Sequence, residues 1–192
     1  MRWLSELKDI EIIGTDGNLM GWLRGFTFAN IGDWRVTSVA VKLEKESHEE
    51  LGVKKPMMSS ALVDIPVDTV KKVSDNMILN QPQRAMKPHL KAHVEAKNIV
   101  NMLNKPVIDS DGKDLGVISD VMLDTDGWRF PSILIKLDKE VLEHLRMDKC
   151  PDCERSVLLP MGNVSTIGDN VMLSITKDVM GTLVQNVSVK TM

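Results

Sequence analysis

The sequence predicts a mainly β protein that contains two small barrels in tandem. The first reason is that the chain matches itself at an offset of about 95 residues, whereas solenoid repeats are about 20–50 residues long, so a whole domain is duplicated. The second reason is that each copy contains short runs of alternating apolar residues separated by Asp/Gly turns. Five or six short strands within about 75 residues favour a closed barrel, which leaves no exposed sheet edge.

The repeat keeps one register from the first turn to the end of each copy. Coinciding residues are, at an offset of 95, Asp16-Gly17 with Asp111-Gly112 and Gly21 with Gly116, and, at an offset of 94, Trp34 with Trp128, Ser38 with Ser132, Pro66 with Pro160 and Leu79 with Leu173. One residue is therefore extra in the first copy, between Gly21 and Trp34, where a turn is expected.

The second copy shows the strands most clearly, because its apolar residues alternate and Asp/Gly turns bound them. The strands are expected at residues 106–108, 115–123, 130–137, 157–160, 164–167 and 171–173, with a short helix at 139–145. The first copy repeats this order from Ile10 to Leu79, so each copy is predicted to form a six-stranded barrel.

A helical linker is expected between the copies, because residues 86–103 are compatible with a helix and prolines flank them. We therefore predict a first barrel at residues 1–81, a helical linker at 82–104 and a second barrel at 105–176. The remaining residues, 177–192, form a tail in which apolar residues recur at helical spacing, which favours a helix, although the β-branched residues there also permit a strand.

Charge and hydrophobicity exclude several classes of protein. The net charge of −3 gives no bulk attraction to nucleic acid or anionic lipid. No apolar run approaches the ~18–20 residues of a membrane span, and the first residues lack the apolar core of a signal peptide. These observations favour a cytoplasmic location and make nucleic acid an unexpected partner.

The sequence contains no recognisable catalytic pattern, so we expect a protein that is not an enzyme and has no catalytic residues. It has no nucleophile elbow, phosphate-binding glycine loop or dinucleotide fingerprint. The segments Asp109-x-Asp111-Gly112 and Asp124-x-Asp126-Gly127 place Gly at position four, whereas a calcium loop of the EF-hand type needs it at six. Both are therefore interpreted as turns.

One tetrapeptide suggests a metal. Cys150-x-x-Cys153 supplies half of a tetrahedral zinc site, and no other cofactor is expected. His89 and His93, four residues apart on the predicted linker helix, are possible partners. The same two cysteines of a second subunit are another possibility, redox chemistry is a third, and two reduced thiols in a surface loop are the plain alternative.

Trp34 and Trp128 are the candidate interaction residues, because exposed tryptophans often anchor protein interfaces. They follow a turn at the same place in both copies. For that reason, burial in the core or in a lid over the barrel is the competing interpretation.

The second copy resembles the PRC-barrel domain. The resemblance lies in Gly112 to Asp124, then in Gly127-Trp128 and in Ile133-Leu134-Ile135. The first copy is a weaker match, since Gly25 stands where the second copy has the acidic residue Asp120. Both copies together make the chain similar to a tandem PRC-barrel protein.

The resemblance implies a six-stranded barrel that serves as an adaptor. Such domains occur in the photosynthetic reaction centre H subunit, as the C-terminal domain of a ribosome-maturation factor, and in archaeal proteins that act with FtsZ and its membrane anchor SepF. A chain made of little but these barrels resembles the archaeal cell-division adaptors most. The expected function is therefore assembly of the division machinery, with recruitment to the division site.

Two other functions stay open. One is an RNA- or ribosome-associated factor of the ribosome-maturation type, and the other is a zinc-binding protein of unknown activity. The expected partners are proteins: FtsZ, SepF, another PRC-barrel protein or a further copy of this chain. If each barrel has a self-pairing surface, the two surfaces either close within the chain or link chains into oligomers.

Overall fold

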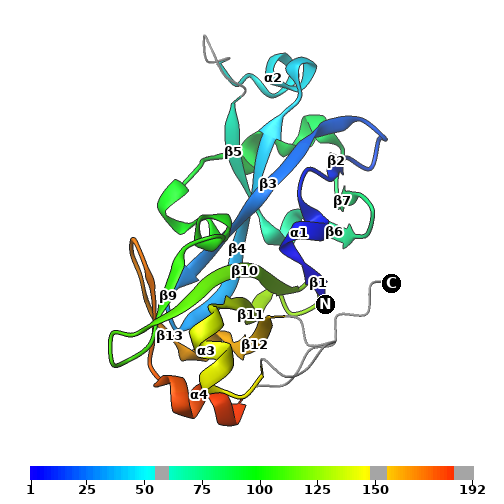
Figure 1. Ribbon diagram of the computed structural model, residues 1–192. Helices are drawn as coiled ribbons and strands as arrows, with labels where there is room; N and C mark the ends of the chain where they lie inside the picture. The colour runs from blue at the N-terminus through cyan, green and yellow to red at the C-terminus, as the bar shows by residue number, and fades with distance from the viewer. Residues whose placement is uncertain (55–60, 148–154, 184–192) are drawn as a thin grey trace.

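The computed structural model describes residues 1–54, 61–147 and 155–183, and it shows a mainly β protein with two halves (Figure 1). The first half and the connection that follows it contain β1 (Arg2–Trp3), α1 (Leu4–Leu7), β2 (Glu11–Ile13), β3 (Leu19–Asn30), β4 (Asp33–Leu43), α2 (Lys45–Leu51), β5 (Leu62–Pro66), η1 (Val67–Thr69), β6 (Val70–Val73), β7 (Met77–Leu79), η2 (Gln83–His89), β8 (Lys91–Ala92), η3 (Glu95–Lys97) and η4 (Ile99–Met102).

The second half repeats this order of elements. It contains β9 (Pro106–Ile108), β10 (Asp114–Asp124), β11 (Arg129–Leu137), α3 (Lys139–His144), β12 (Ser156–Pro160), η5 (Met161–Asn163), β13 (Val164–Ile167), β14 (Val171–Leu173) and α4 (Lys177–Leu183).

Strand pairing is the same in both halves. In the first half β2 pairs with β3, β3 with β4, β4 with β5 and β6 with β7, all antiparallel, and β2 pairs with β7 in parallel. In the second half β9, β10, β11 and β12 pair successively, β13 pairs with β14, and β14 pairs with β9 in parallel. The extra residue of the first half is taken up by bulges near the β3–β4 hairpin.

A glycine fixes the same close approach in each half. Gly21 on β3 has a φ of +158°, and a Cβ there would lie 2.1 Å from the carbonyl oxygen of Lys42. Gly116 on β10 has a φ of +141°, and its Cβ would lie 2.0 Å from the carbonyl oxygen of Lys136. No other residue fits where one strand lies this close to the next.

The strands curl into open sheets, and two closed barrels are not shown. Within the described residues no ladder joins β5 to β6 or β12 to β13, which would close each sheet. Those strands are instead consecutive in the chain, joined through the turns η1 and η5. Pro66 and Pro160 precede the turns, and proline cannot donate a ladder hydrogen bond.

The expected helical linker does not form a continuous helix. Residues 83–102 instead form three short 3₁₀ segments, and the two-residue strand β8 interrupts them by pairing with β5. Pro88 lies within η2, and the hydrogen bonds of His93 hold the chain against the first half. In the tail, α4 covers residues 177–183, and residues 184–192 lie outside the described residues.

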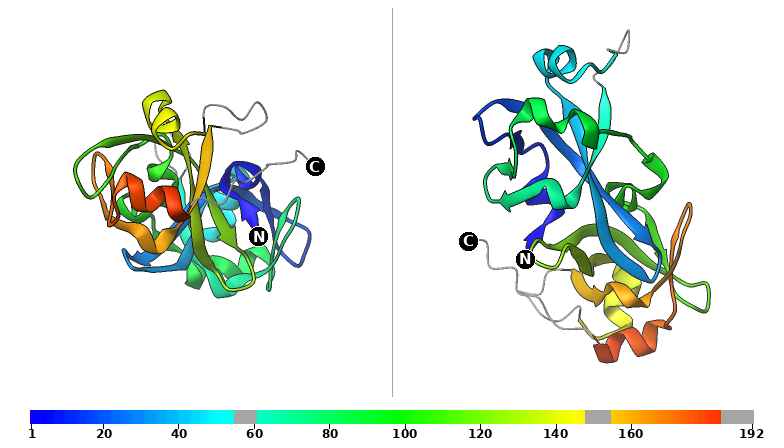
Figure 2. Two further views of the ribbon diagram at one scale, coloured as in Figure 1. Left: turned by 60° about the horizontal axis from the view of Figure 1, so that its bottom comes forward. Right: turned by 180° about the vertical axis from the view of Figure 1, so that it is seen from behind.

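The two halves join along one boundary, which we call the seam. The hairpin of β3 and β4 reaches from the first half to the second (Figure 2), where Arg35 of β4 is paired with Arg129 of β11. At the other side, β1 pairs with β10. Phe26 packs across the seam against Phe130, with ring centroids 6.4 Å apart, so one hydrophobic core runs through both halves.

Candidate protein-docking site

A groove opens at the seam where the β3–β4 and β10–β11 hairpins meet. Its volume is about 560 Å³. We call it the arginine groove, and its lining consists of Gly32, Asp33, Trp34, Arg35, Gly127, Arg129, Phe130, Pro131, Met161 and Gly162. Both halves therefore contribute to it, and it does not exist in either half alone.

The exposed charged groups of the groove include two arginines and Asp33, whose side chain is 51% exposed. The side chains of Arg35 and Arg129 are 68% and 65% exposed. Arg35 binds Asp33 through Nη2 at 3.2 Å, and Arg129 binds Asp124 through Nε at 3.1 Å. Each contact uses one nitrogen, and among the described residues the other guanidinium nitrogens make no hydrogen bond, so they can bind carboxylate or phosphate oxygens.

Asp124 holds the β10–β11 turn that places Arg129. Its carboxylate accepts hydrogen bonds from the backbone N–H groups of Asp126 and Gly127, both at 3.2 Å. The backbone N–H of Gly127 has the largest effect on the pKa of Asp124 and holds it below its ordinary value. The Arg129 guanidinium and the backbone N–H of Asp126 act in the same direction, and burial opposes them. The carboxylate therefore stabilises a turn, as the sequence predicts.

The two candidate tryptophans lie at the seam. Trp34 is 7% exposed, packs on Phe28 with ring centroids 5.3 Å apart, and is one of the residues that line the arginine groove. Trp128 is half-buried, packs against Phe26 at 6.3 Å, and accepts a hydrogen bond from the Val36 N–H through its carbonyl oxygen, at 2.7 Å. Both rings thus pack within the molecule.

A second hollow lies at the seam between α1, β3 and η4, with a volume of about 320 Å³. Its lining is mainly apolar and includes Leu7, Leu23 and Phe26. Gly25 also lines it, and a Cβ there would lie 2.2 Å from Asn98 Oδ1. In the second half the matching residue, Asp120, accepts hydrogen bonds from the N–H and hydroxyl groups of Ser5.

The zinc prediction divides between described and undescribed residues. Cys150 and Cys153 lie outside the described residues, so their role stays a prediction. Both ring nitrogens of His93 are hydrogen-bonded: Nδ1 lies 2.6 Å from Asp64 Oδ1, and Nε2 lies 2.8 Å from Glu95 Oε2. With both nitrogens bound to carboxylates, His93 is not free to ligate zinc, and no metal-binding cluster occurs in residues 1–54, 61–147 and 155–183.

Asp64 is the buried centre of this contact. It lies on β5 and also accepts hydrogen bonds from the Thr27 hydroxyl at 3.1 Å and the Val94 N–H at 3.3 Å. The Asn101 amide and His93 lower the pKa of Glu95 at the outer end. The hydrogen bonds of Asp64 therefore tie the connection between the halves to the first half.

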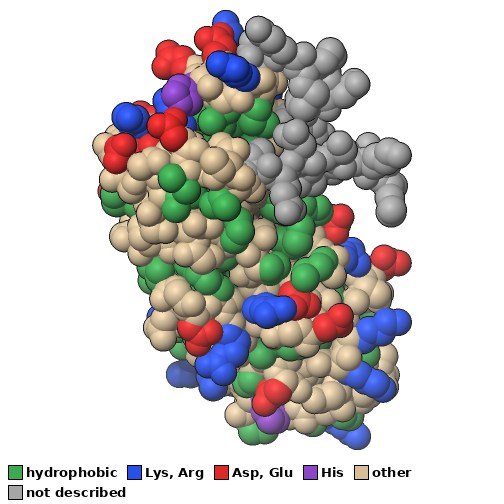
Figure 3. All heavy atoms as spheres, turned by 90° about the horizontal axis from the view of Figure 1, so that it is seen from below, with side chains coloured by type: hydrophobic (Ala, Val, Ile, Leu, Met, Phe, Trp, Pro, Cys, Tyr) green, Lys and Arg blue, Asp and Glu red, His purple; other side chains and the backbone are tan. Residues whose placement is uncertain are grey.

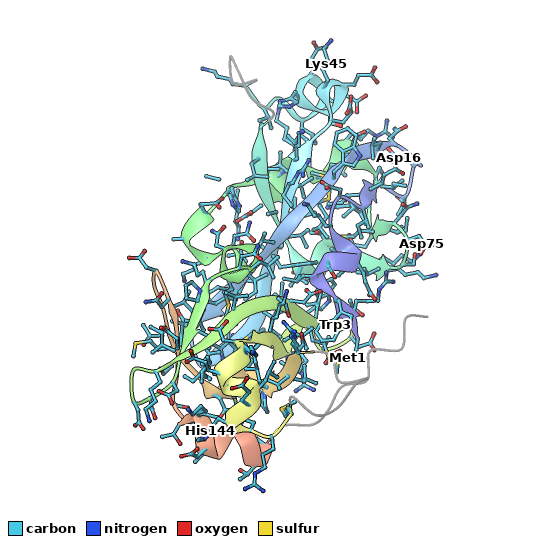
Figure 4. All side chains as sticks on the ribbon, viewed as in Figure 1. Met1, Trp3, Asp16, Lys45, Asp75 and His144 are labelled. Atoms are coloured by element: carbon cyan, nitrogen blue, oxygen red, sulfur yellow. The ribbon has the colours of Figure 1, made fainter. Side chains whose placement is uncertain are left out.

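Charges on the exterior are mixed. On the face that Figure 3 shows, acidic and basic side chains are interspersed rather than gathered by sign. Figure 4 places Trp3 near the seam, whereas Lys45 and His144 lie at opposite ends of the molecule. No helix within the described part of the chain is long and apolar enough to cross a membrane.

Comparison with protein families gives one match: residues 95–180 fit the model of the PRC-barrel domain. The second half is a PRC-barrel domain. The match confirms the resemblance found in residues 112–135, and it does not extend to the first half. It begins at residue 95, so the PRC-barrel domain includes η3 and η4, which lie within the linker predicted at residues 82–104.

No curated protein matches the chain. Among solved structures, a protein from Pseudomonas aeruginosa described as the 16S ribosomal RNA processing protein RimM has 14% identity, covering 80% of this chain and 95% of its own. The TM-score of this match is 0.28.

Neither the groove arginines nor the contacts of Asp64 were predicted from the sequence. A signal for the arginines was present, because the offset of 94 that superposes Trp34 on Trp128 also superposes Arg35 on Arg129. The Asp64–His93 contact had no such signal, since Leu158 matches Asp64 in the second half.

Proposed function

We propose that this chain is a non-enzymatic binding module of the ribosome-maturation type, which docks on a protein surface of a ribosomal particle. The observation that carries the proposal is the PRC-barrel domain at residues 95–180, whose β10–β11 hairpin forms half of the arginine groove. The resemblance described above links such a domain, placed after another domain, with ribosome maturation.

The chemistry of the groove supports a docking role. Arginine and tryptophan are the residue types most enriched at the energetic centres of protein interfaces. Arg35 and Arg129 present exposed guanidinium groups in a groove that is also lined by the half-buried Pro131. This combination suits a partner segment with a carboxylate beside an apolar side chain.

The charge distribution favours protein over RNA as the direct partner. The net charge is −3, and the visible face in Figure 3 has no basic stripe along which a phosphate backbone would lie. Two arginines in one groove give a local contact, whereas a nucleic-acid surface needs many cations.

The first half is, in this proposal, a diverged second PRC-barrel. Its strand pairing, its Gly21 contact and its order of elements match those of the second half. The division adaptor remains the competing function, with the same groove as its docking surface, and the resemblance to archaeal proteins is its support.

Sedimentation of cell extract in moderate salt tests the proposal. The tagged chain is expected to migrate with ribosomal particles, and Arg35→Gln with Arg129→Gln is expected to reduce the bound fraction about tenfold, for a loss of about 1.4 kcal/mol of binding free energy. The matched control replaces Lys113 and Lys139, which are 60% and 80% exposed and lie outside the groove, by Gln.

Two results would contradict the proposal. One is a chain that stays at the top of the gradient and instead recovers FtsZ or SepF, which would establish the division function. The other is an equal loss of binding in the lysine control, which would show that general positive charge, not the groove, holds the chain on the particle.

A further inference from the structure

Two contacts across the seam are images of one another under the sequence repeat. Trp3 of β1 is paired with Met122 of β10. Asn98, just before η4, forms a bridge with Thr27 of β3. At the offset of 95, Trp3 is equivalent to Asn98 and Thr27 is equivalent to Met122. In each half, the segment that precedes β2 or β9 therefore pairs with the long strand, β10 or β3, of the other half.

These two segments, which we call the arms, end at equivalent turns. Asp9 and Asn104 have φ values of +62° and +63°, a conformation that residues other than Gly seldom adopt. The Asp9 N–H donates to the carbonyl oxygen of Leu23, and the Asn104 N–H donates to that of Ile118. The offset of 95 again relates both members of each pair.

A third contact across the seam joins two residues that are equivalent to each other in the repeat. Arg35 is paired with Arg129, and the offset of 94 that holds in this part of the chain carries one onto the other. An antiparallel pair of equivalent residues, flanked by reciprocal arms, is the arrangement of an isologous two-fold interface. The seam therefore has the symmetry of a homodimer interface within one chain.

We propose that the seam is a self-complementary docking surface whose alternative partner is a second copy of this chain. In the resulting dimer, the first half of each chain pairs with the second half of the other. The pairing of β1 with β10 and the arginine pair are restored between chains, while Asn98 keeps its bridge to Thr27 within its own chain. The exchange therefore changes no contact type outside the connection from Leu103 to Lys105. Protein concentration then decides between the closed monomer and the exchanged dimer.

The connection between the halves allows this exchange. β8 pairs with β5 and Asn98 pairs with Thr27, so the chain up to η4 lies on the first half. β9 begins at Pro106 and belongs to the second half. If the three residues from Leu103 to Lys105 become extended, the two halves can separate. Asn104 would then leave its unfavourable backbone conformation, which has a positive φ.

Disulfide trapping tests the proposal on the full chain. The native cysteines are first removed by Cys150→Ser and Cys153→Ser, and the exposed residues Arg35 and Arg129 are then replaced by Cys. Because these two positions are direct partners on neighbouring strands, their Cα atoms are close enough for a disulfide. The variant is unfolded in urea, refolded at low or at high protein concentration, oxidised and run on a non-reducing gel. We expect an intramolecular bridge at low concentration and a band of twice the mass at high concentration.

A control pair, Val117→Cys with Lys136→Cys, lies on neighbouring strands of the second half and must bridge within one chain in both states. Light scattering of the unsubstituted chain refolded at high concentration gives a second reading, with a dimer expected that reverts after unfolding and refolding at low concentration. The proposal is overturned if the chain stays monomeric at high concentration, if a dimer keeps its 35–129 bridge within each chain, or if the control pair forms covalent dimers in equal yield.

Discussion

The two halves share a backbone plan and differ in the polar contacts that hold their ends. In the first half, buried Asp64 binds His93 and ties down the connection that follows. In the second half Leu158 occupies the matching place, and Asp109 instead binds the N–H of Lys177 at the start of α4. Strand pairing and close backbone contacts are therefore common to both halves, while each half has its own polar contacts.

The largest expected effect tests what the halves share. Gly21→Ala and Gly116→Ala each place a Cβ within about 2 Å of a backbone oxygen on the neighbouring strand, and the strand must move. We expect each to lower the free energy of unfolding by about 4 kcal/mol, an exceptional value for one substitution. Urea unfolding followed by tryptophan fluorescence measures both. A large cost at one glycine and a small cost at the other would break the equivalence of the halves.

The next effect tests the first half alone. His93→Ala leaves Asp64 buried without its closest partner, and we expect a loss of about 3 kcal/mol. Leu158→Ala, at the matching place of Asp64 in the second half, is the control and should cost about 1 kcal/mol. Equal costs would mean that the Asp64–His93 contact adds no stability beyond that of an apolar side chain.

A third effect tests the second half. Burial acts to raise the pKa of Asp109, but N–H groups of Lys113, Lys177 and Asp111 prevail and hold it below the ordinary value. Each N–H lies 2.9 Å from the carboxylate, so Asp109→Asn should cost about 2 kcal/mol at neutral pH. Asp16→Asn, whose exposed carboxylate makes longer bonds of 3.3 and 3.4 Å to backbone N–H groups, should cost less.

The pH dependence of the Asp109 variant has a definite sign. A carboxylate with a lowered pKa stabilises the fold fully above its unfolded pKa and loses this contribution as pH falls through the folded pKa. The difference between wild type and Asp109→Asn should therefore be constant above about pH 5 and shrink below about pH 4. Unfolding curves at several pH values measure it, and a difference that grows on acidification would contradict the assignment.

The smallest expected effect is on stability at the groove. Arg35→Gln and Arg129→Gln remove exposed ion pairs, which are worth at most about 0.5 kcal/mol each after solvent screening. The same substitutions should weaken docking tenfold, so thermal unfolding and sedimentation must give different answers. A large loss of stability would assign the arginines to the fold and remove the reason for placing docking there.

Much of the fold was predictable because the repeat and the alternation of apolar residues are local or periodic signals. The strands of the second half, from Pro106 to Leu173, were placed within about one or two residues. The prediction of a helical linker was wrong. The local apolar spacing permits a helix, but the pairing of β8 with β5 and the contact of His93 with Asp64 depend on residues far away in sequence.

The seam was the least predictable part for the same reason. Its contacts join residues such as Trp3 and Met122, and no local pattern records that the arms cross to the opposite half. The repeat did supply the equivalence of Arg35 with Arg129, but only the fold shows that these two residues meet. Symmetry was therefore visible in the sequence, and the interface that expresses it was not.

Hydrogen exchange of the chain bound to purified ribosomal particles would locate the docking surface without any substitution. We predict added protection in the two hairpins that line the arginine groove, at residues 30–36 and 124–131, with little change in α2 and α3 at the far ends. Protection confined to those distant helices, or no added protection with a saturating amount of particles, would contradict the claim that the PRC-barrel domain docks through the groove at the seam.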